Sequence, residues 1–299
     1  MRLALAALML LAACSTPDPS VQAERIGMEL GAKIDSLADA FPGALVAVSV
    51  LDEETGVAIH HNGDSLLHAA STMKVPVLIE LFRQAEAGRF SLDDSLMVKN
   101  EFTSILDGSP YVIEDDSDEE TYQLLGTRQP IRMLAERMSI VSSNLATNLL
   151  IEFLSADSVQ ATIERLGATQ MHVYRGVEDI PAYRAGMNNT ATSHDLAILM
   201  QHIGNGTAVS PAADSAMVDI LLRQRYNEMI PAGLPGVPVA HKTGWITGIR
   251  HDAALVMPEG QSPYTLVILT RDVPTVEEAD AMGAEVARVV HAALRPTAE

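Results

Sequence analysis

A serine and a lysine three residues apart form the pair with the clearest chemical potential. Ser71 and Lys74 stand at the start of an apolar segment that continues to Phe82. If a helix opens at Ser71, the two side chains share one face, because residues three apart are neighbours on a helix surface. A serine hydroxyl is a weak nucleophile until a base takes its proton. Burial can lower the pKa of a lysine enough for it to be that base. The pair therefore predicts nucleophilic catalysis at a helix N-terminus, where free N–H groups stabilise an oxyanion.

Ser-x-x-Lys is a weak signal alone, and two further stretches strengthen it. Ser142-Ser143-Asn144 opens a second predicted helix, and Lys242-Thr243-Gly244 ends a predicted strand. Ser-x-x-Lys, Ser-x-Asn and Lys-Thr-Gly, in this order, resemble the signature of class A β-lactamases and penicillin-binding proteins. The resemblance extends from about residue 21 to residue 294.

The resemblance implies a role in catalysis for residues of each motif. Ser71 would attack a carbonyl and form an acyl-enzyme, and Lys74 would take or relay its proton. Ser142 would pass a proton toward the leaving nitrogen. Asn144 would donate to a substrate amide carbonyl and contact Lys74. The backbone N–H groups of Ser71 and Trp245 would form the oxyanion hole.

The third motif would bind an anionic group of the substrate. Lys242 and Thr243 offer a cation and a hydroxyl, and Gly244 completes their motif. Arg250, on the next predicted strand, is expected to add a bidentate contact to a carboxylate. This cationic cleft suits a carboxylate-bearing β-lactam.

The sequence departs from the family pattern where the acyl-enzyme must be hydrolysed. Glu178 lies at the family's distance past Asn144 and is expected to activate water. Ala182, however, stands where the family places the Asn that holds this water, and Ser143 replaces the usual Asp of the second motif. The alternative interpretation of Glu178 is a solvated loop carboxylate beside Asp179.

Three functions therefore stay open at this point. The first is a class A-type β-lactamase that hydrolyses the β-lactam amide through acyl-Ser71 without a cofactor. The second is a related acyl-serine hydrolase that acts on peptidoglycan peptides or esters. The third is a sensor of β-lactams or peptides that is acylated without fast turnover. Glu178 distinguishes the first from the third.

Other patterns in the chain are interpreted as structural. Residues 63–66 read Gly-Asp-Ser-Leu, a motif of another serine hydrolase group, but they lack its partners and predict a turn. The nine histidines show no zinc-ligand spacing, so no metal is expected. The acidic run 114–120 lacks the spaced ligands and glycine of a calcium loop and is interpreted as a solvated loop.

The elements that must position these motifs predict an α+β protein. Strands are predicted over 44–51, 57–61, 237–241, 249–257 and 264–270, with helices over 21–40 and 276–294. Helices fill the middle of the chain. The pattern predicts an antiparallel sheet built from both termini, flanking terminal helices and an all-helical middle region.

The predicted domain organisation is one catalytic domain over residues 21–299. Its α/β part covers 21–66 and 237–299, and its helical part covers 67–236. The chain has 299 residues, of which 47% are hydrophobic, and a formal net charge of -19. Such acidity argues against nucleic-acid binding, which needs basic patches. We expect a monomer whose partner is a small-molecule substrate.

The N-terminus predicts export and a lipid anchor. Residues 1–13 combine one arginine with a short apolar run, which is typical of a signal peptide and too short to span a membrane. Leu11-Ala12-Ala13-Cys14 resembles a bacterial lipobox, whose cysteine is lipidated; the alternative is an ordinary cleaved signal. Residues 14–20 would be the lipidated tether. Ser15 does not resemble an inner-membrane retention signal, so we expect an outer-membrane lipoprotein that faces the periplasm.

Overall fold

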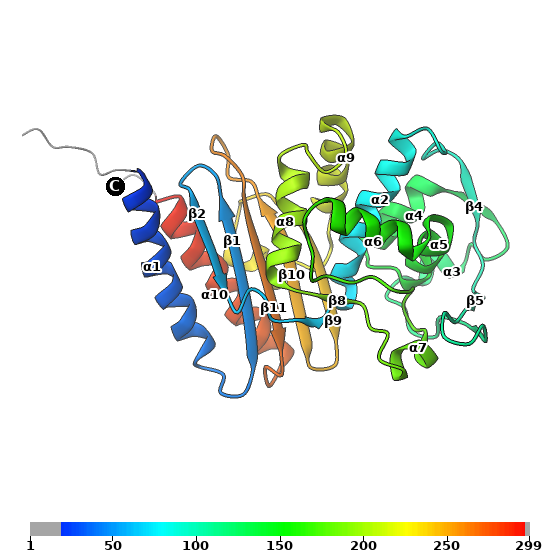
Figure 1. Cartoon of the computed structure of the whole chain (residues 1–299), viewed down its shortest axis with the longest axis horizontal. Helices are drawn as coiled ribbons and strands as arrows, with labels where there is room; N and C mark the ends of the chain where they lie inside the picture. Colours follow the sequence, from blue (N-terminus) through cyan, green and yellow to red (C-terminus); the bar gives the residue numbers. More distant parts are fainter. Residues whose placement is uncertain (1–18, 297–299) are drawn as a thin grey trace, which may run out of the picture.

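A five-stranded antiparallel sheet joins the two ends of the chain (Figure 1). The computed structural model describes residues 19–296. The strand order is β2-β1-β11-β10-β9. The strands are β1 (Leu45–Asp52), β2 (Val57–His61), β9 (Val239–Ile246), β10 (Ile249–Val256) and β11 (Tyr264–Arg271). The predicted α+β class, with a sheet built from both termini, is confirmed.

Hydrophobic side chains are buried on both faces of this sheet. Helices α1 (Pro19–Ala38) and α10 (Val276–Leu294) pack on one face, and α8 (Ser193–Gly204) packs on the other (Figure 1). Successive residues of a strand point to opposite faces. In β11, Ile268 therefore joins the core under the terminal helices, while Leu269 joins the core of the helical region. Burial on both faces explains why β1 and β11 are nearly continuous apolar runs.

The middle of the chain forms the helical region around one buried helix. Its helices are α2 (Lys74–Glu86), α3 (Glu119–Tyr122), α4 (Ile131–Ile140), α5 (Asn144–Leu154), α6 (Ala156–Arg165), α7 (Ile180–Arg184) and α9 (Pro211–Leu221). Every residue of α2 from Lys74 to Phe82 is buried. A helix that is enclosed on all sides is held by its neighbours, so it is a rigid support for the residues at its N-terminus.

Short elements complete the connections. Two 3-10 turns, η1 (Ala70–Met73) and η2 (Pro231–Gly233), precede α2 and β9 in the chain. Three two-stranded ribbons pair β3 (Leu67–His68) with β8 (Thr190–Ala191), β4 (Ser95–Met97) with β7 (Arg128–Pro130), and β5 (Phe102–Thr103) with β6 (Pro110–Tyr111).

Two local predictions were wrong in their boundaries. The helix predicted from Ser71 starts as the 3-10 turn η1, and α2 begins only at Lys74. The strand predicted to end at His241 continues through the Lys-Thr-Gly motif to Ile246, because pairing with β10 holds its polar residues in the sheet. Within the stretch 178–189 lies the short helix α7.

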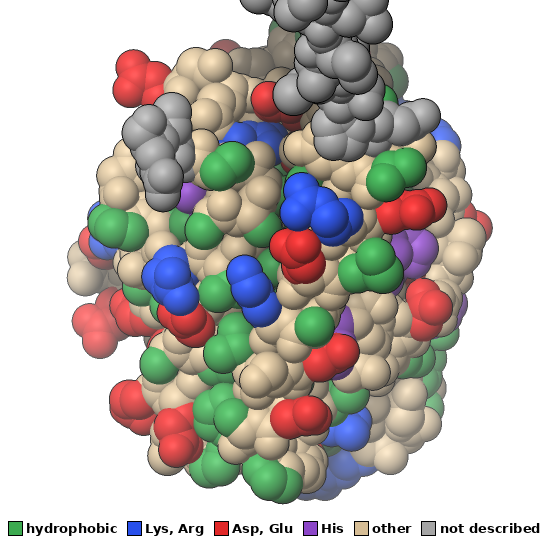
Figure 2. All heavy atoms as spheres, turned by 90° about the vertical axis from the view of Figure 1, so that its left-hand side faces the viewer, with side chains coloured by type: hydrophobic (Ala, Val, Ile, Leu, Met, Phe, Trp, Pro, Cys, Tyr) green, Lys and Arg blue, Asp and Glu red, His purple; other side chains and the backbone are tan. Residues whose placement is uncertain are grey.

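Cys14 and the predicted signal peptide lie outside the described residues, so export and lipidation stay predictions. Of the predicted tether, only Pro19 and Ser20 are described, and they form the start of α1 instead of an extended link. None of the helices in the described range 19–296 is long and apolar enough to cross a membrane. The face that carries α1 shows acidic and basic side chains interspersed among its described residues (Figure 2).

Candidate active site

The free edge of β9 lies against the turn that carries Ser71. β9 is the last strand of the sheet order, so its outer edge has backbone groups that no neighbouring strand pairs. A Cβ added at Gly244 would lie 3.2 Å from the Ala70 Cβ, the Ser71 nitrogen and the Thr72 Cγ2. The motif therefore ends in glycine because the strand backbone closely approaches the predicted nucleophile.

Three non-glycine residues in or beside the predicted site have strained backbones. Ala70, Ser142 and Glu178 have φ angles of 45°, 62° and 60°, in the left-handed region that non-glycine residues rarely adopt. Each such residue costs about 1–3 kcal/mol and persists only where surrounding contacts hold it. Ala70 precedes Ser71 directly, and its N–H donates to His68 Nδ1 at 3.0 Å. Two of these strained residues are thus predicted catalytic residues, and the third directly precedes the predicted nucleophile.

The Lys74 ammonium group connects the first and second motifs. Its Nζ donates to the Ser142 carbonyl oxygen at 2.6 Å, to Ser142 Oγ at 3.1 Å and to Asn144 Oδ1 at 3.0 Å. Lys242 Nζ approaches the same Ser142 Oγ at 3.1 Å and also donates to the Thr243 carbonyl oxygen at 2.8 Å. The Ser142 hydroxyl therefore lies between two lysines from different parts of the chain. Both lysines are 1% exposed.

Burial changes the acid–base chemistry of both lysines. It lowers the pKa of Lys74 to about 7, although the negative charges of Asp116 and Glu178 oppose the shift. Burial, together with the positive charge of Lys74, lowers the pKa of Lys242 well below its ordinary value. An amine with a pKa near 7 is partly unprotonated at neutral pH, so Lys74 can accept a proton there.

Acylation of the protein is therefore expected to depend on pH through Lys74. Only the free amine accepts a proton, so the acylation rate should fall by about tenfold per pH unit below the pKa of about 7. Stopped-flow measurement with a chromogenic cephalosporin between pH 5 and 9 checks this. Lys74→Arg, whose guanidinium stays protonated, should abolish the reaction over the whole range. A midpoint above pH 9 would contradict the assignment.

Glu178 belongs to the same cluster. Its Oε2 accepts from the Glu114 N–H at 2.9 Å and its Oε1 from Asn144 Nδ2 at 3.3 Å, so Asn144 bridges Lys74 and Glu178. Partial burial raises the pKa of Glu178 above its ordinary value, while these hydrogen bonds oppose the shift. Glu178 is therefore half-buried and hydrogen-bonded to two neighbouring segments. Ala182 is fully buried in α7.

Asn148 and Asp179 hold the loop that carries Glu178, and neither is among the predicted site residues. Asn148 accepts from the Val177 N–H at 2.7 Å and donates to the Val177 carbonyl oxygen at 3.0 Å. Asp179 accepts from Ser104 Oγ at 2.7 Å and caps α7. Asn148 lies on the buried face of a predicted helix, but no pattern in the sequence indicates its partner.

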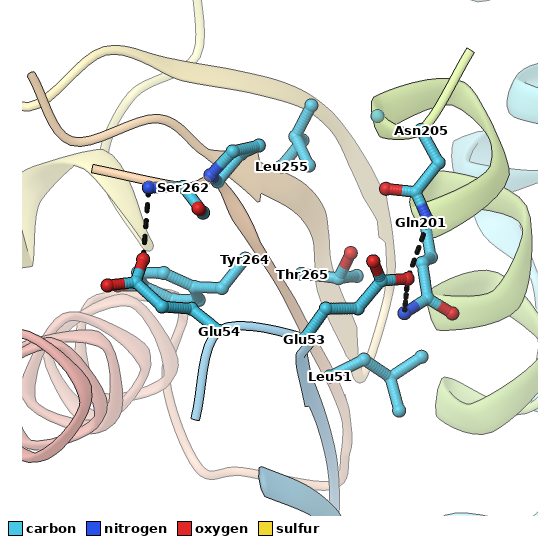
Figure 3. A pocket seen from close by; sticks show the side chains of 11 residues that line it. Leu51, Glu53, Glu54, Gln201, Asn205, Leu255, Ser262, Tyr264 and Thr265 are labelled. Carbon is cyan, nitrogen blue, oxygen red and sulfur yellow. Dashed lines mark hydrogen bonds between the residues drawn. The ribbon is translucent and has the colours of Figure 1, made fainter. Parts of the chain in front are cut away.

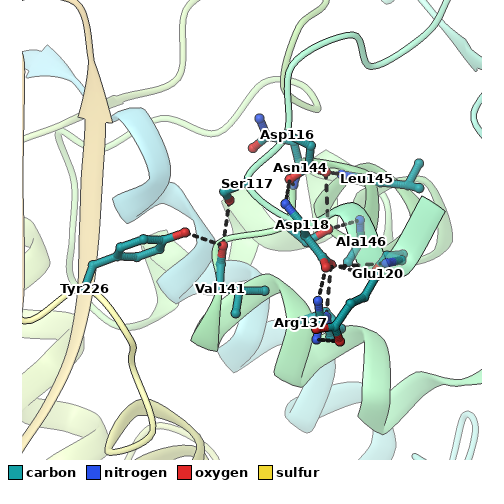
Figure 4. Close-up of polar contacts among 12 residues, drawn as sticks. Asp116, Ser117, Asp118, Glu120, Arg137, Val141, Asn144, Leu145, Ala146 and Tyr226 are labelled. Atoms are coloured by element: carbon teal, nitrogen blue, oxygen red, sulfur yellow. Dashed lines mark hydrogen bonds and ion pairs between the residues drawn. The ribbon is translucent and has the colours of Figure 1, made fainter. Parts of the chain in front are cut away.

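Two residues of the acidic run 114–120, Asp116 and Asp118, are bound to neighbouring elements (Figure 4). The interpretation of the run as a solvated loop is therefore wrong for these two residues. Asp116 accepts from the N–H groups of Asn144 and Leu145 at 3.0 and 2.8 Å. Asp118 is buried and forms an ion pair with Arg137. Asp116 therefore caps helix α5, and Asp118 is held by an ion pair.

Arg250 lies at the site's edge with its guanidinium already paired. Its Nε and Nη2 donate to the two carboxylate oxygens of Asp280 in α10 at 2.6 and 2.9 Å, and Glu228 lies 3.6 Å away. The predicted bidentate contact to a substrate carboxylate therefore competes with an internal one. Arg250 pairs in register with Trp245, which is 62% exposed, whereas Thr243 is 6% exposed.

His241 points away from Lys242, as strand alternation predicts. Its Nδ1 lies 2.8 Å from Asp252 Oδ1, and its Nε2 lies 3.1 Å from Asn227 Oδ1. Asp252 also accepts from the Ile230 N–H at 3.2 Å. These buried contacts hold β9 in place directly behind the third motif.

A separate pocket at the β1–α8 side shares none of the predicted site residues (Figure 3). Its acidic groups are already bound, since Glu53 accepts from Gln201 and Asn205 and Glu54 accepts from the Ser262 N–H. Within the described range, no three His, Cys, Asp or Glu side chains gather as a metal site.

Comparisons with known proteins agree with this arrangement. The model of the β-lactamase enzyme family matches residues 29–294. A β-lactamase from Rhodobacter capsulatus is 25% identical over 237 residues, covering 77% of this chain and 76% of the relative. A β-lactamase from Amycolatopsis lactamdurans is 25% identical over 290 residues, covering 94% and 88%.

Solved structures share the fold. PBP-A is 26% identical, with a TM-score of 0.78 and coverage of 89% of this chain and 96% of that chain. An ancestral class A β-lactamase, from the last common ancestor of Gram-negative bacteria, is 24% identical with a TM-score of 0.75, covering 87% and 98%.

Proposed function

The chain belongs to the β-lactamase enzyme family, and on this premise we propose that it hydrolyses β-lactam amides through an acyl-enzyme on Ser71. The observation that carries the proposal is the placement of Ser142 Oγ, 3.1 Å from both Lys74 Nζ and Lys242 Nζ. A hydroxyl in contact with a buried amine can donate its own proton to a leaving group and take a replacement proton from that amine. Transfer to a leaving nitrogen requires such a group.

In the proposed acylation, the unprotonated Lys74 takes the proton of Ser71 as the serine oxygen attacks the lactam carbonyl. The backbone N–H groups of Ser71 and Trp245 stabilise the resulting oxyanion. The carbon–nitrogen bond then breaks, Ser142 donates its proton to the nitrogen, and Lys74 returns a proton to Ser142. Asn144 keeps Lys74 in position, and Lys242 with Thr243 attracts the anionic group of the substrate.

In the proposed deacylation, Glu178 takes a proton from water as the water oxygen attacks the ester carbonyl of acyl-Ser71. The bond between that carbon and Ser71 Oγ then breaks, the proton held by Glu178 passes to the serine oxygen, and the product leaves as a carboxylic acid. The raised pKa of Glu178 suits a general base, because a more basic carboxylate accepts a proton more readily. A single-residue mutant of PBP-A was solved as an acyl-enzyme complex with penicillin G. That protein is 26% identical to this chain, which supports acylation by a penicillin here.

A second candidate function is a related acyl-serine protein with slow deacylation: a sensor, or a hydrolase of peptidoglycan peptides or esters. The contacts of Glu178 favour it. Both carboxylate oxygens of Glu178 accept internal hydrogen bonds, and Ala182 has no polar group to hold a water molecule.

Nitrocefin turnover by the purified full chain, combined with intact-protein mass spectrometry, tests these candidates. Repeated turnover with little accumulated adduct is the expected result. A persistent adduct without turnover would replace the first candidate with the second. Absence of both adduct and turnover would contradict the proposed function.

Asp280 is expected to weaken the binding of carboxylate-bearing substrates. Asp280→Asn removes the charge that competes for Arg250, so the KM for such a β-lactam should fall by about 3- to 10-fold with little change in kcat. Steady-state kinetics of the two proteins measure this. Glu285→Gln, which removes an acid from an exposed pair on the same helix, is the matched control and should leave the KM unchanged. A rise in KM for Asp280→Asn would show that Asp280 instead holds Arg250 in its binding position.

A further inference from the structure

We propose that Asp116 is a positioning residue that supplies, from a neighbouring loop, the anionic acceptor for the turn formed by Ser142, Ser143 and Asn144. In its effect on catalysis the inference rests on the proposed function, since that turn carries the proton donor and the substrate-binding amide. No part of the sequence signature includes Asp116.

The contacts of Asp116 cover the N-terminus of α5. Its Oδ1 accepts from the Asn144 N–H at 3.0 Å and its Oδ2 from the Leu145 N–H at 2.8 Å (Figure 4). The next N–H group, of Ala146, donates to Ser143 Oγ at 3.2 Å. The first N–H groups of a helix have no partners within the helix, and a carboxylate is their strongest acceptor. Asp116 therefore completes the cap that Ser143 begins.

The turn needs such support because its backbone is strained. Ser142 has a φ of 62°, and its carbonyl and hydroxyl oxygens both accept from Lys74. A small rotation at this residue would move Ser142 Oγ away from its place between the two lysines. The N–H groups that Asp116 binds follow Ser142 by two and three residues, so the contact holds the C-terminal side of the turn.

The loop around Asp116 is itself fixed. The Asp118 N–H donates to Asp116 Oδ1 at 3.2 Å, and Ser117 Oγ donates to the Val141 carbonyl oxygen at 2.7 Å. The side chain of Asp118 is fully buried and forms an ion pair with Arg137 of α4. An acceptor held this way restrains its partner, whereas a carboxylate on a mobile loop would not.

Asp116 also compensates for the residue at position 143. The related enzymes that the second motif resembles usually have Asp there, and in this chain Ser143 provides one uncharged acceptor instead. Ser143 Oγ lies 3.4 Å from Asp116 Oδ2, so the carboxylate occupies the space beside the shorter side chain. In this chain the negative charge beside the turn therefore comes from the loop. It also faces Lys74, whose pKa it raises.

The decisive comparison uses Asp116→Asn, with Glu119→Gln as the control. Glu119 is an exposed acid three residues along the same run, in the first turn of α3. Asp116→Asn should slow acylation by nitrocefin by about 10- to 100-fold, because one N–H group loses its acceptor and the charge is removed. It should also shift the acid limb of the pH profile to lower pH, since the pKa of Lys74 falls without that charge. Glu119→Gln should change neither quantity.

A rescue experiment separates the role of the charge from a general loss of structure. Ser143→Asp should restore acylation and the position of the acid limb in the Asp116→Asn background. In the wild-type background it should impair both, because two carboxylates would then share one site. Failure of the rescue, or an Asp116→Asn variant within about twofold of wild type with an unmoved limb, would overturn the proposal.

Amide hydrogen exchange keeps this test independent of the proposed function. The N–H groups of Asn144 and Leu145 should be protected in wild type, exchange faster in Asp116→Asn and be protected again in the double variant. The measurement needs no substrate. If the exchange pattern appears but wild type is never acylated, the proposed function fails and the positioning role stands; equal exchange in all three proteins overturns the positioning role itself.

Discussion

Ser71→Ala should abolish the covalent adduct and lower turnover of a β-lactam by about a thousandfold or more. The Ser71 hydroxyl is placed in the η1 turn directly before Lys74, where it can form the proposed acyl ester, and alanine keeps the backbone that contacts Gly244. Intact-protein mass spectrometry after exposure to penicillin G measures the adduct directly. Nitrocefin hydrolysis measures turnover.

Ser65→Ala is the matched control for this experiment. Ser65 belongs to the Gly-Asp-Ser-Leu stretch that resembles another hydrolase motif but lies in the turn before β3. Its replacement should leave both the adduct and turnover unchanged. Hydrolysis that persists in Ser71→Ala, or an adduct that is lost in Ser65→Ala, would place the nucleophile elsewhere.

Glu178→Gln should convert the protein into one that is acylated but turns over slowly. Glutamine retains the shape and an acceptor for the Asn144 and Glu114 donors, but it cannot take a proton from water. Loss of a general base costs about 100- to 10,000-fold in rate. The adduct on Ser71 should therefore accumulate to stoichiometry, while its rate of formation changes much less.

The time course of adduct decay by mass spectrometry measures this effect. Glu119→Gln, an exposed carboxylate outside the site cluster, serves as the control and should deacylate at the wild-type rate. Equal decay in Glu178→Gln and wild type would show that Glu178 is not the base. If both decayed slowly, the protein would act as a sensor or a slow acyl-serine enzyme.

Fast and slow deacylation would involve the same cluster of residues around Lys74 and Glu178. The proposed acylation would use Lys74, Ser142 and Lys242, and the Ser142 hydroxyl lies within hydrogen-bond distance of both lysines. Deacylation depends on whether water can reach Glu178, which already accepts from Asn144 and Glu114 and shares its loop with the apolar Ala182. Fast turnover would therefore require a water molecule held by backbone groups or by Asn144.

The sequence by itself determined the class of fold, and it predicted which groups react. Apolar runs at both ends and helical spacing between them are local properties, and they predicted the α+β arrangement and the bounds of α10 closely. The three motifs are recognised by their residue types and by their spacing, both of which can be read in the sequence. The contact between Lys74 and Asn144 was expected from the resemblance of the motifs and is present.

Only the tertiary structure decided how the charged residues are partnered. Asp116 caps α5 across 28 residues of sequence, and Arg250 is bound by Asp280, which lies 30 residues further along the chain. The partner of a carboxylate depends on which loop or helix packs beside it, and residue type does not encode that. The same acidic pattern can be a solvated loop or a helix cap. For this reason Ser71 and Lys74 could be predicted from the three ordered motifs, whereas the contacts of Asp116, whose charge acts on the pKa of Lys74, became visible only in the folded chain.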